Sequence, residues 1–143
     1  MDIINISELP SIRYPAGRIS RPIIGGTGPI SSIHFTMGYV MLDPDGGQIP
    51  WHNHDPEEAY YILSGEGELC INSEIEIIRP GQLAYIPPHS FHQLTNISSC
   101  PLIMLYCCGK GAVLHGMQEL QGTLPKAGED IPPVPNGGRK QRA

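Results

Sequence analysis

Hydrophobic residues occur along this chain in short runs, and Gly or Pro separates most of the runs from one another. Short apolar runs bounded by turn residues are typical of β-strands. The 17 Gly and 15 Pro among the 143 residues fall mainly between the runs, where they are typical of turns. The pattern therefore predicts an all-β fold. The predicted strands are residues 32–42, 59–63, 69–71, 75–78, 83–86 and 101–108.

The two ends of the chain differ from this central region, which spans residues 30–108. Residues 1–29 hold a short apolar piece and then arginines among Pro and Gly, and they predict an N-terminal arm with extended strands. In residues 109–143 this pattern of short apolar runs fades. Residues 113–120 predict a short helix, and the Pro- and Gly-rich remainder predicts an extended tail. We therefore expect one domain, flanked by an arm and a tail.

Charge and composition narrow the classes of function. The formal net charge is −5 and no basic cluster is present, so neither nucleic acid nor an anionic membrane is an expected partner. No apolar run is long enough to span a bilayer, and the N-terminus lacks the basic region and cleavage site of a secretion signal. These features predict a cytoplasmic protein. Its cysteines, at positions 70, 100, 107 and 108, lack zinc-finger spacing and are expected to be reduced.

Two histidines and a glutamate carry the strongest chemical signal. His52 and His54 are two residues apart, so a strand would point both imidazoles to the same face. Glu58 keeps this parity after a turn at Asp55-Pro56 and can face the same interior. Two imidazoles and a carboxylate suit a divalent transition metal. His92, from a distant strand, can supply a fourth ligand.

Two motifs carry a resemblance to a known family. The first consists of Gly46, His52, His54, Glu58 and Gly65, and the second of Gly81, Pro87, His92 and Asn96. In these residues and spacings, the chain resembles the small single-domain cupins. His89 stands where the second motif has a glycine, which affects the turn but no metal ligand.

The resemblance implies a double-stranded β-helix, that is, a jelly-roll barrel, with a metal bound near its wider end. The ligands that it implies are His52, His54, Glu58 and His92. It also implies that the N-terminal strands pair with a second subunit, so we expect a homodimer. Pairing of this kind would cover edge strands, which otherwise favour aggregation.

The ligand types leave the identity of the metal open. Imidazole and carboxylate do not choose sharply among iron, manganese, nickel, cobalt and zinc. We expect one divalent ion per chain and favour Fe(II), because this ligand set is close to the two-histidine, one-carboxylate set of non-haem iron oxygenases. A barrel without metal that serves as a binding module is the alternative, and the complete set of four ligands argues against it.

Further residues are candidates for contact with a substrate. Tyr60 shares the parity of Glu58 and would orient the substrate or relay protons; a core tyrosine is the alternative. His89 is a second candidate for proton relay, with an exposed loop histidine as its alternative. Glu58 itself could leave the metal to accept a proton. The side chains expected to bind the substrate are Tyr39, Trp51, Tyr60, Phe91, Met104 and Tyr106.

These features predict a metal-dependent enzyme that acts on a small oxygenated organic molecule, with a non-haem iron dioxygenase as the favoured type. Arg79 is the only basic residue between Gly46 and Tyr106. This argues against a sugar phosphate, unless an arginine of the N-terminal arm (Arg13, Arg18 or Arg21) reaches the pocket. Two alternatives remain: an oxygen-independent isomerase, lyase or decarboxylase with the metal as Lewis acid, and a small-molecule-binding module without turnover.

Overall fold

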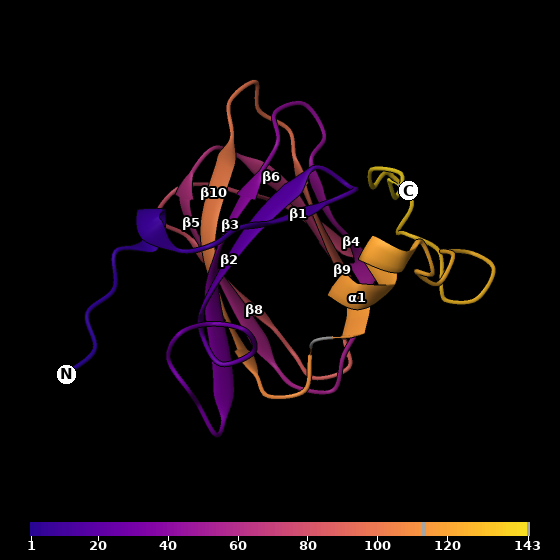
Figure 1. Ribbon diagram of the computed structural model, residues 1–143. Helices are drawn as coiled ribbons and strands as arrows, with labels where there is room; N and C mark the ends of the chain where they lie inside the picture. Colours follow the sequence, from indigo (N-terminus) through magenta and orange to yellow (C-terminus); the bar gives the residue numbers. More distant parts are fainter. Residues whose placement is uncertain (113, 143) are drawn as a thin grey trace.

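Two antiparallel β-sheets pack face to face in the computed structural model, which describes residues 1–112 and 114–142 (Figure 1). The larger sheet consists, in spatial order, of β1 (Ile12–Tyr14), β2 (Arg18–Ile24), β3 (Phe35–Leu42), β10 (Leu102–Gly109), β5 (Glu58–Ser64) and β8 (Leu83–Ile86). The smaller sheet consists of β4 (Gln48–His52), β9 (His92–Asn96), β6 (Gly67–Ile71) and β7 (Glu74–Ile78). The all-β jelly-roll fold expected from the sequence is confirmed.

The alternation within β3 shows which side chains fill the space between the sheets. Gly38, Val40 and Leu42 are buried, whereas Tyr39 and Met41 are only partly buried and have the opposite parity. The inward parity continues across the sheet, because the β3 positions 40 and 42 lie opposite inward positions of β2 and β10. The buried core residues are Val40, Leu42, Ile49, Tyr60, Ile62, Leu69, Ile78, Ile86, Leu94, Leu102 and Met104.

The N-terminal strands extend the larger sheet of their own chain. β1 pairs with β2, and β2 pairs with β3, with Ser20 opposite Val40. Arg13 and Arg21 lie outside the barrel: Arg13 forms an ion pair with Asp43, and Arg21 donates to the carbonyl of Leu9. A role of these strands in a dimer stays a prediction.

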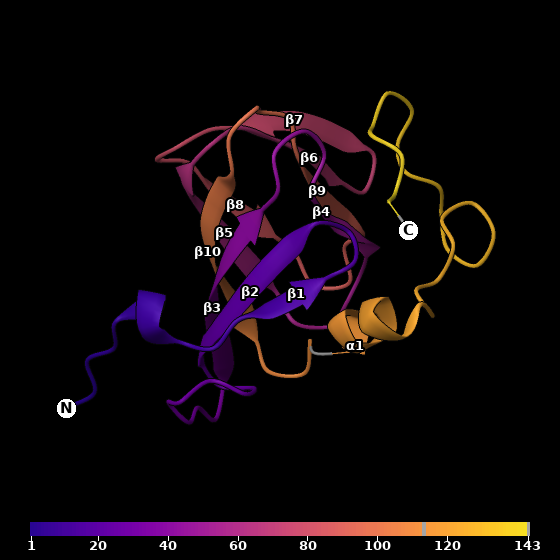
Figure 2. The same cartoon turned by 45° about the horizontal axis from the view of Figure 1, so that its top comes forward.

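The C-terminal segment covers the outer face of the smaller sheet (Figure 2). Glutamine side chains of the sheet donate to the backbone of this segment. Gln48 donates to the carbonyl of Lys140 and Gln93 to that of Arg139, both at 2.9 Å. The Trp51 indole donates to the carbonyl of Pro132 at 2.9 Å and is 1% exposed. All residues of β4 and β9 are therefore buried, since one face meets the barrel and the other meets this segment.

The short helix expected over residues 113–120 is present as α1 (Leu114–Gln121); Val113 lies outside the described residues. Gly116 lets the helix approach β1 closely, because a Cβ atom there would lie 3.2 Å from the hydroxyl oxygen of Tyr14. A 3₁₀ turn, η1 (Ile6–Glu8), precedes β1. Among the described residues, no helix has the length and hydrophobicity that crossing a bilayer requires.

We predict that removal of residues 132–143 lowers the free energy of unfolding by about 3–5 kcal/mol, because the smaller sheet loses several hydrogen bonds and its apolar cover. Trp51 is the only tryptophan, so its fluorescence should shift to longer wavelength when this cover is lost. Urea unfolding and emission spectra measure both effects. Lys140→Ala is the matched control, because it keeps the backbone carbonyl that Gln48 contacts and should change neither signal. Unchanged fluorescence in the truncated chain would contradict the observed cover.

Candidate metal centre

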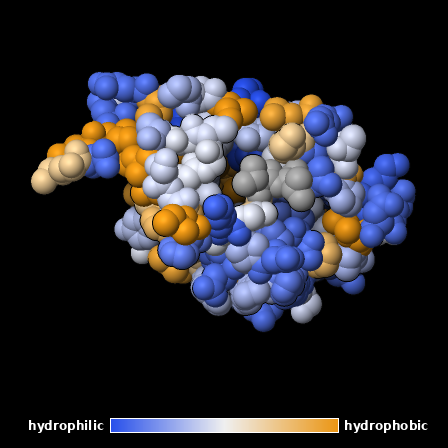
Figure 3. Space-filling model, turned by 60° about the horizontal axis from the view of Figure 1, so that its bottom comes forward, coloured by the Kyte–Doolittle hydropathy of each residue, from blue (hydrophilic) through white to orange (hydrophobic). Residues whose placement is uncertain are grey.

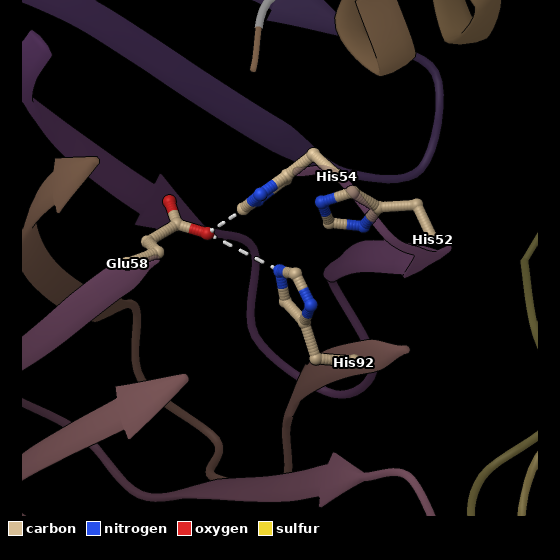
Figure 4. Close-up of side chains that lie close together, drawn as sticks. All are labelled: His52, His54, Glu58 and His92. Carbon is tan, nitrogen blue, oxygen red and sulfur yellow. Dashed lines mark hydrogen bonds and ion pairs between the residues drawn. The ribbon is translucent and has the colours of Figure 1, made fainter. Parts of the chain in front are cut away.

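Three strands and the connection between β4 and β5 bring three histidines and one glutamate together (Figure 4). His52 ends β4, Glu58 begins β5, His92 begins β9, and His54 lies between β4 and β5. Each residue offers one ligand atom, and these four atoms lie within 4.8 Å of one another. β4 and β9 pair antiparallel with His52 opposite His92, which places the two imidazoles side by side. The cluster could therefore bind a metal ion.

Backbone carbonyls fix the orientation of the three imidazoles. Nδ1 of His52 lies 2.7 Å from the Pro50 carbonyl oxygen, and Nδ1 of His92 lies 2.8 Å from that of Ser90. His54 makes the same kind of contact with the Pro56 carbonyl, at 2.8 Å. A carbonyl can only accept a hydrogen bond, so each Nδ1 carries the proton and each Nε2 is left to face the cluster.

The Nε2 atoms have the surroundings that a metal ligand requires. Nε2 of His52 is buried and has no hydrogen-bond partner, which is costly for a polar atom unless an ion binds there. Burial, and then the neighbouring His115 and His92, lower the pKa of His52 well below its usual value, so this imidazole stays neutral. A neutral imidazole with a free, buried Nε2 fits a metal site.

Glu58 supplies the negative charge of the cluster. Its Oε2 lies 3.0 Å from Nε2 of His54 and 3.2 Å from Nε2 of His92. Burial raises the pKa of Glu58, but the hydrogen bonds to these two histidines outweigh burial and hold the pKa at about 2. For His54, burial lowers the pKa, and the hydrogen bond and charge of Glu58 outweigh this and raise it. The contact between His54 and Glu58 is an ion pair whenever His54 is protonated.

A fourth histidine, His115 of α1, stacks on the cluster from outside. The rings of His115 and His52 are 3.7 Å apart between centroids and inclined by only 15°. Burial, together with the charge of Arg18, lowers the pKa of His115 to about 3, so its ring is neutral. Nδ1 of His115 is buried without a hydrogen-bond partner. The helix thus closes the side of the cluster that the barrel leaves open.

A cavity of about 400 Å³ adjoins the cluster and lies between the barrel interior and α1. His54 and Glu58 form part of its wall, and most of the remaining wall is apolar. Apolar lining residues include Ile12, Val40, Ile49, Met104, Met117 and Leu120. The surface at this end of the molecule mixes hydrophilic residues with hydrophobic patches (Figure 3). Met117 and Leu120 of the lining are 52% and 51% exposed, so the cavity opens to solvent beside α1. The volume suits a small organic ligand.

One arginine does reach this cavity. Arg18 of β2 lines it, is 4% exposed, and lies with its guanidinium carbon 3.9 Å from the ring centroid of Tyr14. Its Nη2 forms an ion pair with Oε2 of Glu119 in α1 at 2.8 Å. Glu119 also accepts from the backbone N–H of Ala16 at 3.1 Å, which anchors the helix to the N-terminal strands.

The structure places the six expected substrate residues in two groups. Those that line the cavity are Tyr60, Met104 and Tyr106. Those outside the described lining are Tyr39, Trp51 and Phe91. Tyr39 has the outward parity of β3, and Trp51 lies beneath the C-terminal segment, stacked on Phe91 with 5.7 Å between ring centroids.

His89 lies apart from the cavity. Its backbone has φ = 63°, the left-handed conformation that the glycine of the motif would adopt more easily. The backbone N–H donates to the carbonyl of His54 at 2.9 Å, while the side chain is 69% exposed beside Asp55. The turn therefore supports His54 through its backbone, and the imidazole points to solvent.

Sequence reasoning missed His115 and Glu119 and weighed Arg18 only as an exception. His115 and Glu119 are four residues apart, a spacing that places them on one face of the predicted helix. That spacing was the available signal. It did not show which part of the barrel the helix would cover.

Comparison with known proteins identifies the domain. The family model for the cupin domain matches residues 38–108. Protein MJ1618 of Methanocaldococcus jannaschii is 38% identical over 78 residues, which are 54% of this chain and 62% of that protein. A 5-nitrosalicylic acid 1,2-dioxygenase from Bradyrhizobium sp is 28% identical over 109 residues, covering 74% of this chain and 52% of the enzyme. This chain thus spans less than two thirds of the length of either relative.

A solved structure supports the same fold. The polyketide cyclase RemF from Streptomyces resistomycificus superposes with a TM-score of 0.67 at 20% identity, covering 78% of this chain and 80% of that one. At this identity the likeness concerns the fold alone. The segment that matches the family model contains both histidine motifs and the strands that position them, and on this evidence residues 38–108 form a small cupin domain.

Proposed function

We propose that this protein is a metal-dependent cupin enzyme that oxidises a small organic molecule with dioxygen, with Fe(II) as its metal. The observation that carries the proposal is the cluster of His52, His54, Glu58 and His92 beside a largely apolar cavity, with His54 and Glu58 in its wall. The similarity to a protein named as a dioxygenase supports this choice among metal-dependent reactions.

The four residues of the cluster would hold the ion through three imidazole Nε2 atoms and one carboxylate. When bound, a divalent iron would supply a Lewis acid toward the oxygen atoms of the substrate and a source of electrons for dioxygen. The chain supplies imidazoles whose orientation is fixed by backbone carbonyls, and a carboxylate that is ionised at any working pH. The ligand set is therefore preorganised before an ion arrives.

Two tyrosines can direct the substrate. Burial, and then the charge of Glu58, raise the pKa of Tyr60 well above its usual value and that of Tyr106 to about 12. Both hydroxyl groups thus keep their protons and can donate hydrogen bonds to a substrate oxygen. Gly38 makes room for Tyr106, because a Cβ atom there would lie 2.6 Å from the Tyr106 hydroxyl oxygen. The apolar walls exclude water from the reacting group.

Oxygen uptake by the iron-loaded protein tests the proposed function. A panel of small phenols, hydroxy acids and diketones should contain compounds that cause oxygen consumption in step with their own loss. Zinc-loaded protein is the redox-inactive control and should consume none. Turnover of a compound under anaerobic conditions would replace the oxygenase with the Lewis-acid alternative. Binding without turnover in either atmosphere would leave a binding module.

We predict that the purified protein binds about one divalent ion per chain and that His52→Ala lowers its metal affinity by at least about tenfold, because one of four ligands is removed. Elemental analysis after dialysis measures the metal content. His34→Ala is the matched control, since His34 is exposed and lies outside the cluster, and it should keep the metal. Equal metal content in both variants would show that the ion binds elsewhere.

We predict that metal affinity falls as the pH is lowered, and that the fall begins at a pH above 6.5. The raised pKa of His54 means that a proton already competes for this imidazole above the usual value of 6.5, and each ion must displace it. Affinity should therefore rise with pH and level off above the pKa of His54, whereas Glu58, with a pKa of about 2, contributes no change in this range. Competition titration with a zinc chelator from about pH 6 to about pH 8.5 measures the slope. A flat profile would contradict the prediction.

A further inference from the structure

The guanidinium of Arg18, in the wall of the cavity, has a nitrogen without a hydrogen-bond partner. Its Nη1 atom is buried and has no hydrogen-bond partner, while Nη2 faces Glu119. A guanidinium has five N–H donors, and leaving one unpaired inside a protein costs free energy. Arg18 lines the cavity that also exposes His54 and Glu58. An acceptor on a bound molecule would satisfy this donor.

The charges around the cavity indicate what kind of acceptor fits. Among the described residues that line it, Arg18 is the only lysine or arginine, and Glu58 is the only carboxylate. Glu119 balances Arg18. A divalent ion with neutral imidazoles beside the single charge of Glu58 would leave one positive charge uncompensated, and buried charge favours a counter-ion. A singly charged anion would balance it, whereas a phosphate ester would bring excess negative charge.

We propose that the cavity binds a small, largely apolar carboxylate whose carboxylate group accepts hydrogen bonds from Arg18. This inference rests on the proposed function in taking the cavity as the substrate site, and it names the class of substrate. The carboxylate binds the arginine at the β2 side, and the apolar body lies against Tyr60, Tyr106 and Met104. The end remote from the carboxylate is thereby directed to the wall formed by His54 and Glu58.

In this arrangement Glu119 is the counter-ion of Arg18 and does not contact the ligand. It pairs with Nη2 of the guanidinium and accepts from the backbone N–H of Ala16. The Tyr14 ring stacked on the guanidinium limits its movement further. The carboxylate of Glu119 is therefore not needed for ligand contact, and its removal should free a second guanidinium nitrogen for the ligand.

Calorimetric titration with benzoate and with its uncharged counterpart benzamide tests the inference. Zinc-loaded and metal-free protein are both used, because zinc prevents oxidation. We expect benzoate to bind about tenfold to a hundredfold more tightly than benzamide, as charge-assisted hydrogen bonds to a buried guanidinium allow. Equal affinity for the two compounds, or no detectable binding of benzoate, would overturn the proposal without any variant.

The variants separate a ligand contact from a structural ion pair. The double variant Arg18→Gln/Glu119→Gln replaces the ion pair by a neutral amide pair, which avoids an unpaired buried charge, and it should lose the preference for benzoate. Glu119→Gln alone keeps Arg18 and should bind benzoate at least as tightly as the natural chain. Loss of the preference in both variants would show that the ion pair only anchors α1. Thermal unfolding of each variant confirms that it is folded.

The metal-loaded arm separates this inference from the proposed function. A benzoate preference that persists in the zinc-loaded double variant would place the carboxylate on the metal and overturn the role of Arg18, while an oxygenase would still be possible. An Arg18-dependent preference in a protein that consumes no oxygen with any compound would support the carboxylate site and overturn the oxygenase. Oxygen uptake therefore tests the proposed function, and calorimetry tests the carboxylate site separately.

Discussion

The buried carboxylate of Glu58 is the constraint on which the metal end of the barrel depends. Burying an ionised carboxylate costs several kcal/mol unless other groups compensate it. His54 and His92 face it with their Nε2 atoms, while the carbonyls of Pro56 and Ser90 hold their Nδ1 atoms. The two rings beside this carboxylate are thus also the ones that backbone carbonyls hold in orientation.

A second compensated charge organises the opposite wall of the cavity. Helix α1 has eight residues, too few to be stable in isolation, and it is held by the ion pair of Glu119 with Arg18 and by the close approach of Gly116 to Tyr14. These contacts bring His115 onto the ring of His52. Segments outside both histidine motifs therefore complete the surroundings of the cluster.

The success of sequence analysis depended on the range of the interactions involved. The all-β fold followed from short apolar runs separated by Gly and Pro, and the meeting of His52, His54 and Glu58 from strand parity and a short turn. Parity alone could not say which face of β3 lines the barrel, so it did not separate Tyr39 from its buried neighbours. The position of Glu119 depends on contact with Ala16, 103 residues away, and no local pattern encodes such a contact.

The position of β10 has a consequence for how the chain folds. This strand pairs with both β3 and β5, so the larger sheet cannot be completed until residues near the end of the barrel have joined strands made much earlier. A topology rich in such distant pairings has high contact order and folds slowly, on the scale of milliseconds to seconds. The geometry of the histidine cluster requires β4, β5 and β9 to be in place. An ion that binds only this assembled geometry would slow the unfolding of the barrel and leave its folding rate almost unchanged.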